Sequence, residues 1–102
     1  MEPMPRPTRL ADHDVQQALS SLDGWGRTGD EIVKTYECPS FADAIAFVVR
    51  IAFLAEKAQH HPDLDIRWRT VKVALTTHDA SGLTELDVAL ARRIEEEAQW
   101  SS

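Results

Sequence analysis

The chain has 102 residues, of which 43% are hydrophobic, and this length predicts one globular domain with a modest core. Its formal net charge of -6, from 11 Lys and Arg against 17 Asp and Glu, disfavours direct binding to nucleic acid or to an anionic membrane surface. A single cysteine, Cys38, excludes an internal disulfide, and we expect neither a signal peptide nor a bilayer-spanning segment, hence a soluble protein of the cytoplasm.

The first part of the chain predicts a tail, a short helix and a hairpin. Residues 1–9 contain three prolines and are expected to form a flexible tail, so that a single domain spans residues 10–102. Residues 12–22 carry apolar side chains at the i, i+3, i+4, i+7 spacing of an amphipathic helix. Residues 25–37 predict a hairpin, because Gly29-Asp30 can form its turn and an alternating, β-favouring run follows.

The longest predicted helix begins after Ser40 and is ended by Pro62. Ser40 and Asp43 have the spacing of a capping box, which satisfies free backbone groups at a helix start. Apolar residues occupy more than one side of this helix, as expected if it covers a sheet and also meets a partner. We expect one apolar face to hold Phe41, Ala44, Ile45, Val48, Ala52 and Ala55, and a different face to hold Phe47 and Leu54.

A second hairpin is predicted over residues 64–75. Leu64, Ile66 and Trp68 alternate with charged residues, which predicts a half-buried strand and places Trp68 in the core rather than at a ligand. A tight turn is expected near Arg69-Thr70, and the alternating strand after it completes the hairpin.

A loop over residues 78–83 then leads to a last helix, which the capping-box pair Thr84 and Asp87 begins. The order helix, two strands, helix, two strands, helix predicts an α+β fold, with three helices on one face of a four-stranded antiparallel sheet. The residues expected on the open, partly solvated face of the sheet are Lys34, Arg67 and Lys72.

Three of the four histidines fall within residues 60–78. Glu56 and His60 are four residues apart, so they would share a face at the end of the long helix, and His61 follows directly. His78 comes after the last strand. If the second hairpin doubles back, these four side chains converge at one rim of the sheet.

In their order and spacing these residues resemble the motif of the pterin-4a-carbinolamine dehydratase family. That motif is an acidic or polar residue, three residues, His-His-Pro, an aromatic residue, His and then Asp. The sequences around Trp25, Tyr36 and Gly82 also resemble those of the family, so the likeness covers nearly the whole chain beyond the tail. Gln59 departs from the family, where Asp or Asn is common. The matching residues are Glu56, His60, His61, Pro62, Trp68, His78 and Asp87.

The resemblance implies an enzyme that removes water from 4a-hydroxytetrahydropterin and releases a quinonoid dihydropterin. It implies His60 and His78 as the main acid and base, a role that suits imidazole because its ordinary pKa of about 6.5 lies near neutrality. His61 would bind and orient the pterin or assist proton transfer, and Glu56 would orient His60 or help hold its charge. Which histidine is the acid and which the base stays open.

The resemblance also implies supporting roles, a small-molecule pterin partner, and assembly as a homodimer or homotetramer. Asp87 would fix the loop that carries His78, in addition to capping the helix at Thr84. No metal or redox cofactor is expected, because oxidation states do not change in the reaction. The residues implied as pterin contacts are Pro62, Asp79, Ala80 and Ser81, and those implied as supporting residues are Asp87 and Trp68.

Two other functions are compatible with the same residues. Histidines with a glutamate could bind zinc or iron, although the adjacent His60 and His61 would point in different directions on a helix. A non-catalytic dimerisation module is the second alternative, because Phe47 and Leu54 could form an apolar partner surface. Such a module would have no need of the whole histidine set.

Overall fold

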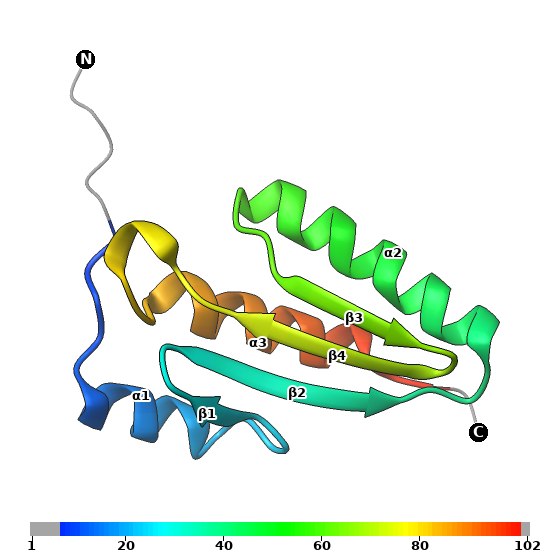
Figure 1. Cartoon of the computed structure of the whole chain (residues 1–102), viewed down its shortest axis with the longest axis horizontal. Coiled ribbons are helices and arrows are strands. Elements are labelled where there is room, and N and C mark those ends of the chain that lie inside the picture. The colour runs from blue at the N-terminus through cyan, green and yellow to red at the C-terminus, as the bar shows by residue number, and fades with distance from the viewer. Residues whose placement is uncertain (1–6, 101–102) are drawn as a thin grey trace.

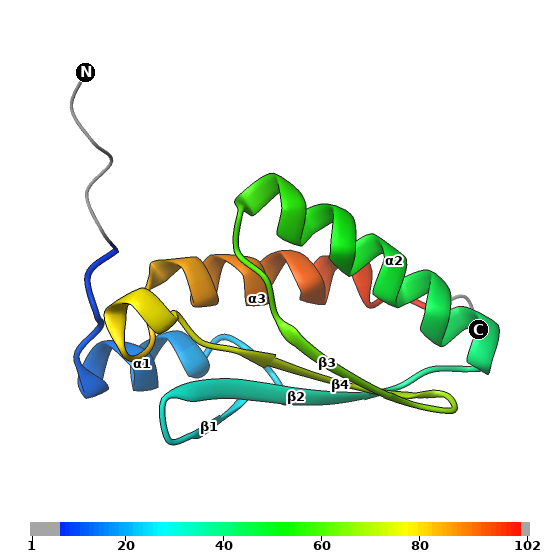
Figure 2. The same cartoon turned by 45° about the horizontal axis from the view of Figure 1, so that its top comes forward.

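The computed structural model describes residues 7–100 and confirms the predicted α+β fold. One four-stranded antiparallel sheet has the strand order β1-β2-β4-β3, and helices lie on one side of it (Figures 1 and 2). No helix within these residues is both long and apolar enough to cross a membrane. In chain order the elements are α1 (Asp12–Leu19), β1 (Gly26–Thr28), β2 (Glu31–Glu37), α2 (Phe41–Ala58), β3 (Asp63–Arg67), β4 (Thr70–Leu75), the 3-10 turn η1 (His78–Ala80) and α3 (Glu85–Glu97).

The N-terminal segment runs beside the loop that precedes α3. The predicted tail of residues 1–9 falls largely on residues 1–6, which lie outside the described residues. Next to Arg9, the backbone N–H of Leu10 donates to the carbonyl of Leu83 at 2.8 Å. Figure 1 shows this stretch rising past the loop between β4 and α3.

The helix α1 is shorter than predicted. It ends at Leu19, because the N–H groups of Ser21 and Leu22 turn to carbonyls three residues back instead of four, at 3.2 and 3.0 Å. Leu22 nevertheless stays in the core, with 3% of its surface exposed. The hairpin of β1 and β2 follows as predicted, with Thr28 opposite Glu31 at its turn.

The helix α2 begins as predicted but ends four residues before Pro62. The Ser40 hydroxyl accepts a hydrogen bond from the N–H of Asp43. At the other end Gln59 adopts a left-handed backbone conformation with φ 52°, and the N–H of His60 donates to the Ala55 carbonyl at 3.1 Å. This is the geometry by which helices commonly end, usually on Gly or Asn. The left-handed residue turns His60 away from the helix axis.

The two apolar faces of α2 are distributed differently from the prediction. Phe47, predicted on a different face from Ala44 and Ala55, is fully buried with them, whereas Phe41 and Ile45, predicted on the same face as Ala44 and Ala55, are exposed. Side chains spaced four residues apart do not stay on one face, because an α-helix has 3.6 residues per turn. The side chains that follow Phe41 and Ile45 at this spacing therefore point away from the core. The core face holds Ala44, Phe47, Ile51 and Ala55, and the exposed stripe, which we call the outer α2 stripe, holds Phe41, Ile45, Val49 and Phe53.

The strand β3 lies at the edge of the sheet and is more exposed than predicted. Ile66 faces the helix side but keeps 39% of its surface exposed. The prediction that Trp68 belongs to the core is wrong: it is 74% exposed and, with Arg69, forms the turn between β3 and β4, at φ 55°. Alternation predicts which face a side chain takes, but not whether another element covers that face at an edge.

A single carboxylate joins α3 to the sheet. Glu95 accepts hydrogen bonds through Oε1 from the indole N–H of Trp25 at 3.1 Å, from Lys34 Nζ at 2.5 Å and from the Tyr36 hydroxyl at 2.5 Å. The prediction that Lys34 lies on the open face is therefore wrong, since it pairs opposite the buried Val73 on the helix-covered side. Arg67 and Lys72 are exposed and lie on the other face of the sheet from Lys34.

The environment of Glu95 shifts two pKa values in opposite directions. Burial raises the pKa of Glu95, but hydrogen bonds from Lys34 and Tyr36, with the charge of Lys34, outweigh it and leave that pKa below its ordinary value. Burial, followed by the hydrogen bond to Glu95 and its charge, raises the pKa of Tyr36. The folded chain therefore favours an ionised Glu95 and a neutral Tyr36.

We predict that Glu95 contributes stability that is present above the ordinary carboxyl pKa of about 4.3 and is lost as the pH falls through its lower folded value. Glu95→Gln should reduce the free energy of unfolding at pH 7 by about 1–3 kcal/mol, because it removes a charge-assisted interaction. Urea denaturation at pH 7 and pH 3 measures the difference between wild type and variant, which should shrink at the lower pH.

The matched control is Glu96→Gln. Glu96 is exposed and lies 3.6 Å from Arg93, one turn away on the same helix. Its loss should cost less than about 0.5 kcal/mol at either pH. Equal effects of the two substitutions would contradict the special role of Glu95.

Candidate functional site

Three segments that are distant in sequence meet at one end of the molecule. His60 follows the end of α2, Thr77 follows β4, and Asp87 lies in the first turn of α3. Figures 1 and 2 both show the end of α2, the loop after β4 and the start of α3 gathered at the same end. The end of α2 and the loop after β4, which carries His78, thus lie at the same end of the molecule.

Asp87 is the centre of this junction and is fully buried. Its Oδ1 lies 2.6 Å from Nε2 of His60. Its Oδ2 accepts from the Thr77 hydroxyl at 2.8 Å and from the N–H of Thr84 at 2.9 Å. Because a buried carboxylate is costly unless donors surround it, these three contacts explain how Asp87 is held in the core.

The capping role that the sequence predicts for Asp87 is confirmed, but its contact with His60 was not predicted. Thr84 and Asp87 form the complete capping box at the start of α3. That box uses one carboxylate oxygen and leaves the other needing a donor. The capping acid that follows the last of the three histidines was the available signal in the sequence, and Thr77, which the prediction missed, carried none.

Glu56 pairs with His61, not with His60 as predicted. Oε2 of Glu56 lies 2.7 Å from Nε2 of His61, and both side chains are mostly exposed. The four-residue spacing assumed a helix through His60. Gln59 ends the helix first, so His60 turns inward to Asp87 and His61 takes the position beside Glu56.

His78 sits on a small closed loop. The N–H of Thr77 donates to the Gly82 carbonyl at 3.0 Å, and the N–H of Gly82 returns a bond to the Thr77 carbonyl at 3.3 Å. His78 and the predicted pterin contacts Asp79, Ala80 and Ser81 form this loop, of which Ala80 is half-buried and the others are exposed. The Thr77 hydroxyl ties the loop to Asp87, which is a physical route for the support predicted between Asp87 and the loop of His78.

The structure does not bring all of the predicted residues together. Within residues 7–100 no hydrogen bond joins His78 to His60 or His61. Pro62 is half-buried directly after His61, at the start of β3. Trp68 lies beyond the other end of β3, at the opposite end of the sheet from the histidines (Figure 1). Trp68 is therefore too far from these histidines to support them within the same chain.

The described residues offer no cluster for the metal-binding alternative. In the range 7–100 no group of three or more His, Cys, Asp and Glu side chains is placed to hold an ion. The two histidine–carboxylate contacts instead form separate pairs, one buried and one exposed.

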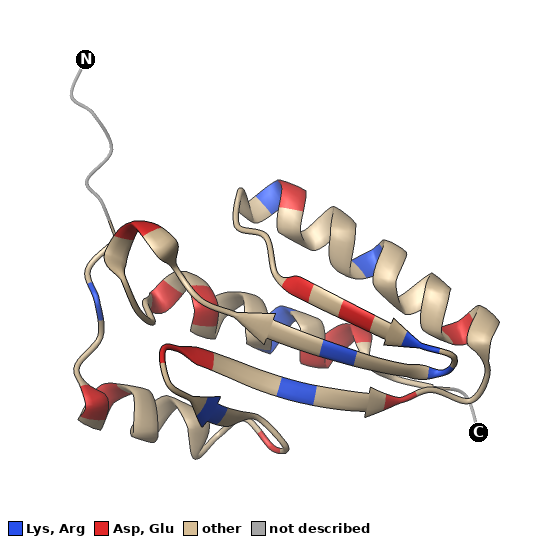
Figure 3. Cartoon of the chain, viewed as in Figure 1, with Lys and Arg blue, Asp and Glu red and all other residues tan. Residues whose placement is uncertain are grey.

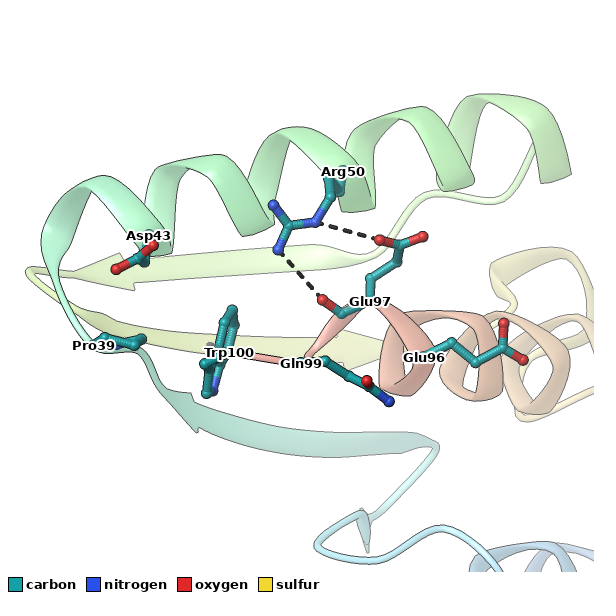
Figure 4. A pocket seen from close by; sticks show the side chains of 7 residues that line it. All are labelled: Pro39, Asp43, Arg50, Glu96, Glu97, Gln99 and Trp100. Carbon is teal, nitrogen blue, oxygen red and sulfur yellow. Dashed lines mark hydrogen bonds and ion pairs between the residues drawn. The ribbon is translucent and has the colours of Figure 1, made fainter. Parts of the chain in front are cut away.

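A cavity of about 380 Å³ lies at the far end of α2, between its N-terminal half and the end of α3. Figure 4 shows Arg50 pointing across it to Glu97. The guanidinium Nε lies 3.3 Å from the Glu97 carboxylate, and Nη2 donates to the Glu97 carbonyl at 3.3 Å, so the charge of Arg50 is already compensated. No histidine lines this cavity, whose residues are Pro39, Asp43, Arg50, Glu96, Glu97, Gln99 and Trp100.

Comparison with known proteins gives a family match over most of the chain. The family described as Pterin 4 alpha carbinolamine dehydratase matches residues 8–97. A protein from Roseiflexus sp. (strain RS-1) is 60% identical over 89 residues, covering 87% of this chain and 96% of the relative. One from Nocardia farcinica (strain IFM 10152) is 53% identical over 90 residues, covering 88% and 95%. Both are named as candidate pterin-4-alpha-carbinolamine dehydratases.

Two solved structures share the fold. A transcriptional coactivator/pterin dehydratase from Brucella melitensis has a TM-score of 0.88 and 34% identity, covering 90% of this chain and 100% of that one. A pterin dehydratase-like protein identified as a RuBisCO assembly factor of the alpha-carboxysome has a TM-score of 0.63, covering 76% of this chain and 89% of that one. At 24% identity the second likeness bears on the fold alone.

We predict that Asp87→Ala lowers the free energy of unfolding by about 2–4 kcal/mol, because it removes a helix cap and leaves three buried donors without an acceptor. Asp43→Ala is the matched control, since Asp43 has the equivalent place in the exposed first turn of α2 and should cost less than about 1 kcal/mol. Urea denaturation at pH 7 compares them. Equal costs would contradict the buried network around Asp87.

Proposed function

The chain belongs to the pterin-4a-carbinolamine dehydratase family, and we propose that it catalyses the dehydration of 4a-hydroxytetrahydropterin to a quinonoid dihydropterin and water. The reaction makes it a hydro-lyase that acts in pterin recycling. The observation that carries the proposal is the buried His60–Asp87 pair at 2.6 Å, placed where His61 and the loop of His78 also lie. Such a pair holds an imidazole in one orientation, as acid/base catalysis requires.

The proposed reaction needs two proton transfers and no change of oxidation state. The substrate carries a hydroxyl group on the ring carbon next to a ring N–H. A general acid protonates the hydroxyl oxygen, the carbon–oxygen bond breaks, and water leaves. A general base removes the proton from the neighbouring nitrogen, whose electron pair forms the new carbon–nitrogen double bond. One proton is given and one is taken, so solvent exchange restores the enzyme.

Imidazole groups on different segments suit these two transfers. We assign His60 and His78 as the principal acid and base, with His61 orienting the pterin or assisting the transfers. Support for His60 is its contact with Asp87, and support for His61 is its contact with Glu56. Glu56 would thus act on His61 in place of the predicted action on His60. Imidazole as a side-chain type can both give and take a proton near neutral pH, which suits this pair of transfers.

The pterin would lie against the exposed loop that carries His78. The closed bridge between Thr77 and Gly82 gives this loop a defined shape, and Ser81 holds a left-handed conformation with φ 54°. The flat substrate would contact the loop from one side and the chain after His61 from the other. The residues assigned to these contacts are Pro62, Asp79, Ala80 and Ser81.

We place the enzyme in the cytoplasm, because a chain with a single cysteine forms no internal disulfide and so suits a reducing compartment.

We also propose that copies of this chain associate, as a homodimer or homotetramer. The outer α2 stripe exposes Phe41, Ile45, Val49 and Phe53 by 51%, 36%, 47% and 73%. In the sheet that the described residues form, β3 is an edge strand with one side unpaired. Contiguous exposed apolar side chains mark association surfaces, and a domain this small gains core by sharing it. The same stripe supports the alternative of an interaction module that binds another protein.

We predict that the protein accelerates the dehydration of 4a-hydroxytetrahydropterin in a stopped-flow absorbance assay. His60→Ala and His78→Ala should each lower kcat by about 10²–10⁴-fold, because a lost acid or base removes one proton transfer. His13→Ala is the matched control, since His13 is an exposed residue of α1, and should leave kcat unchanged. Circular dichroism checks that each variant is folded.

No acceleration by folded wild-type protein would refute the proposed activity. Unchanged kcat in His60→Ala would remove His60 from the reaction while leaving the activity itself in place. These two results are distinct, so the assay separates the function from the assignment of the residue.

We predict that a double substitution in the outer α2 stripe, Val49→Asp with Phe53→Asp, yields monomers, because it places two charges in an apolar contact. Sedimentation velocity measures the change from the wild-type oligomer. Thr35→Asp, an exposed position on the open face of the sheet, is the control and should leave the oligomer intact. A monomeric wild-type protein would contradict self-association.

A further inference from the structure

We infer that Thr77 is a positioning residue that acts through Asp87 to fix His60 with its hydrogen on Nε2, leaving Nδ1 as the nitrogen that exchanges protons with the substrate. The tautomer follows from contacts within the chain, whereas its use in catalysis rests on the proposed function. Nδ1 of His60 is thereby named as the atom that exchanges protons, which the family likeness does not specify.

The direction of each hydrogen bond around Asp87 can be followed from donor to acceptor. The N–H of Leu86 donates to the Thr84 hydroxyl oxygen at 3.2 Å. The Thr84 hydroxyl hydrogen then needs an acceptor, and the Thr77 hydroxyl oxygen lies 2.8 Å away. The Thr77 hydroxyl in turn donates to Oδ2 of Asp87 at 2.8 Å. The two threonines therefore form a one-way chain of donors that ends on the carboxylate.

Asp87 Oδ2 receives a second hydrogen from the N–H of Thr84 at 2.9 Å. Oδ1 is then the oxygen that faces His60, and an ionised carboxylate can accept but not donate. Nε2 of His60, at 2.6 Å, must therefore carry the hydrogen in both the neutral and the cationic imidazole. Proton gain and loss is confined to Nδ1.

Nδ1 of His60 is placed to meet a substrate. Among residues 7–100 it has no hydrogen-bond partner, yet every side-chain nitrogen or oxygen of these residues that is fully buried has one. Nδ1 therefore reaches the surface, although the His60 side chain as a whole is 10% exposed. The ring is held at one end in the core and offers its other nitrogen outward.

Thr77 also connects this ring to the second proposed catalytic histidine. Its backbone closes the loop of His78 through Gly82, and its hydroxyl meets the carboxylate that holds His60. Thr77 thus links the loop that carries His78 to the carboxylate that holds His60. Thr77 touches no reacting atom in this scheme and acts through Asp87.

The test compares Thr77→Val, which removes the hydroxyl group and keeps the side-chain shape, with Thr77→Ser, which keeps the hydroxyl. In wild-type protein, proton–nitrogen correlation NMR of labelled histidine should show neutral His60 in the Nε2–H form. Thr77→Val removes one of the two donors that hold Oδ2, so the Asp87 carboxylate can turn away from His60, and rings released from Oδ1 should take both tautomers. The variant should lower kcat by about 10–100-fold with little change in KM, because His60 is misoriented after the substrate binds. Thr77→Ser should restore both readouts.

Neutral His60 in the Nδ1–H form in wild-type protein would overturn the inference without any variant. A folded Thr77→Val protein with unchanged tautomer and unchanged kcat would overturn the role of Thr77. If the wild-type protein shows no dehydratase activity but holds the Nε2–H form and loses it in Thr77→Val, the proposed function fails and the positioning of His60 by Thr77 stands.

Discussion

The contact between the Asp87 carboxylate and the His60 ring is the interaction on which the arrangement of this end of the molecule depends. It joins the segment after α2 to the first turn of α3, and through Thr77 it also holds the end of β4. None of these three segments is fixed by local structure alone: one is a loop after a left-handed residue, one is a closed turn, and one is a helix start. A fully buried carboxylate with donors on both oxygens gives them one common point.

A second carboxylate has the equivalent place near the other end of α3. Glu95 collects three donors from the turn before β1 and from β2, and so anchors the C-terminal half of the helix on the sheet. The helix is therefore fixed at two separated points by polar contacts, with apolar packing by Leu90, Ala91 and Ile94 between them. Its rotation and its position along its own axis are both restricted, which keeps Asp87 in register with His60.

The fold was predictable from the sequence because local signals agreed with one another. Alternation, turn residues and two capping patterns defined the elements and their order, and hairpins imply antiparallel neighbours. Side-chain environments were less predictable. Apolar stripes on two sides of α2 do not say which one meets the sheet, and alternation at Trp68 does not say that the strand lies at an edge. Both depend on contacts between distant segments.

The site shows the same limit more sharply. The residue types and their order pointed to one end of the sheet, and the family likeness supplied their chemistry. The pairing was beyond sequence reasoning, because it turned on the backbone conformation of one residue: Gln59, in a left-handed conformation, sends His60 to Asp87 and leaves Glu56 to His61. A spacing rule that assumes continuous helix gives the opposite partners.

The position of Asp87 after His60, Thr77 and every strand of the sheet has a consequence for how the protein is made. His60, Thr77 and the whole sheet leave the ribosome before the carboxylate that orients them, and Glu95 follows later still. A nascent chain can therefore pair its strands while its histidines remain unarranged. The growing polypeptide therefore acquires the His60–Asp87 contact only at the step when α3 docks, after its strands can already have paired.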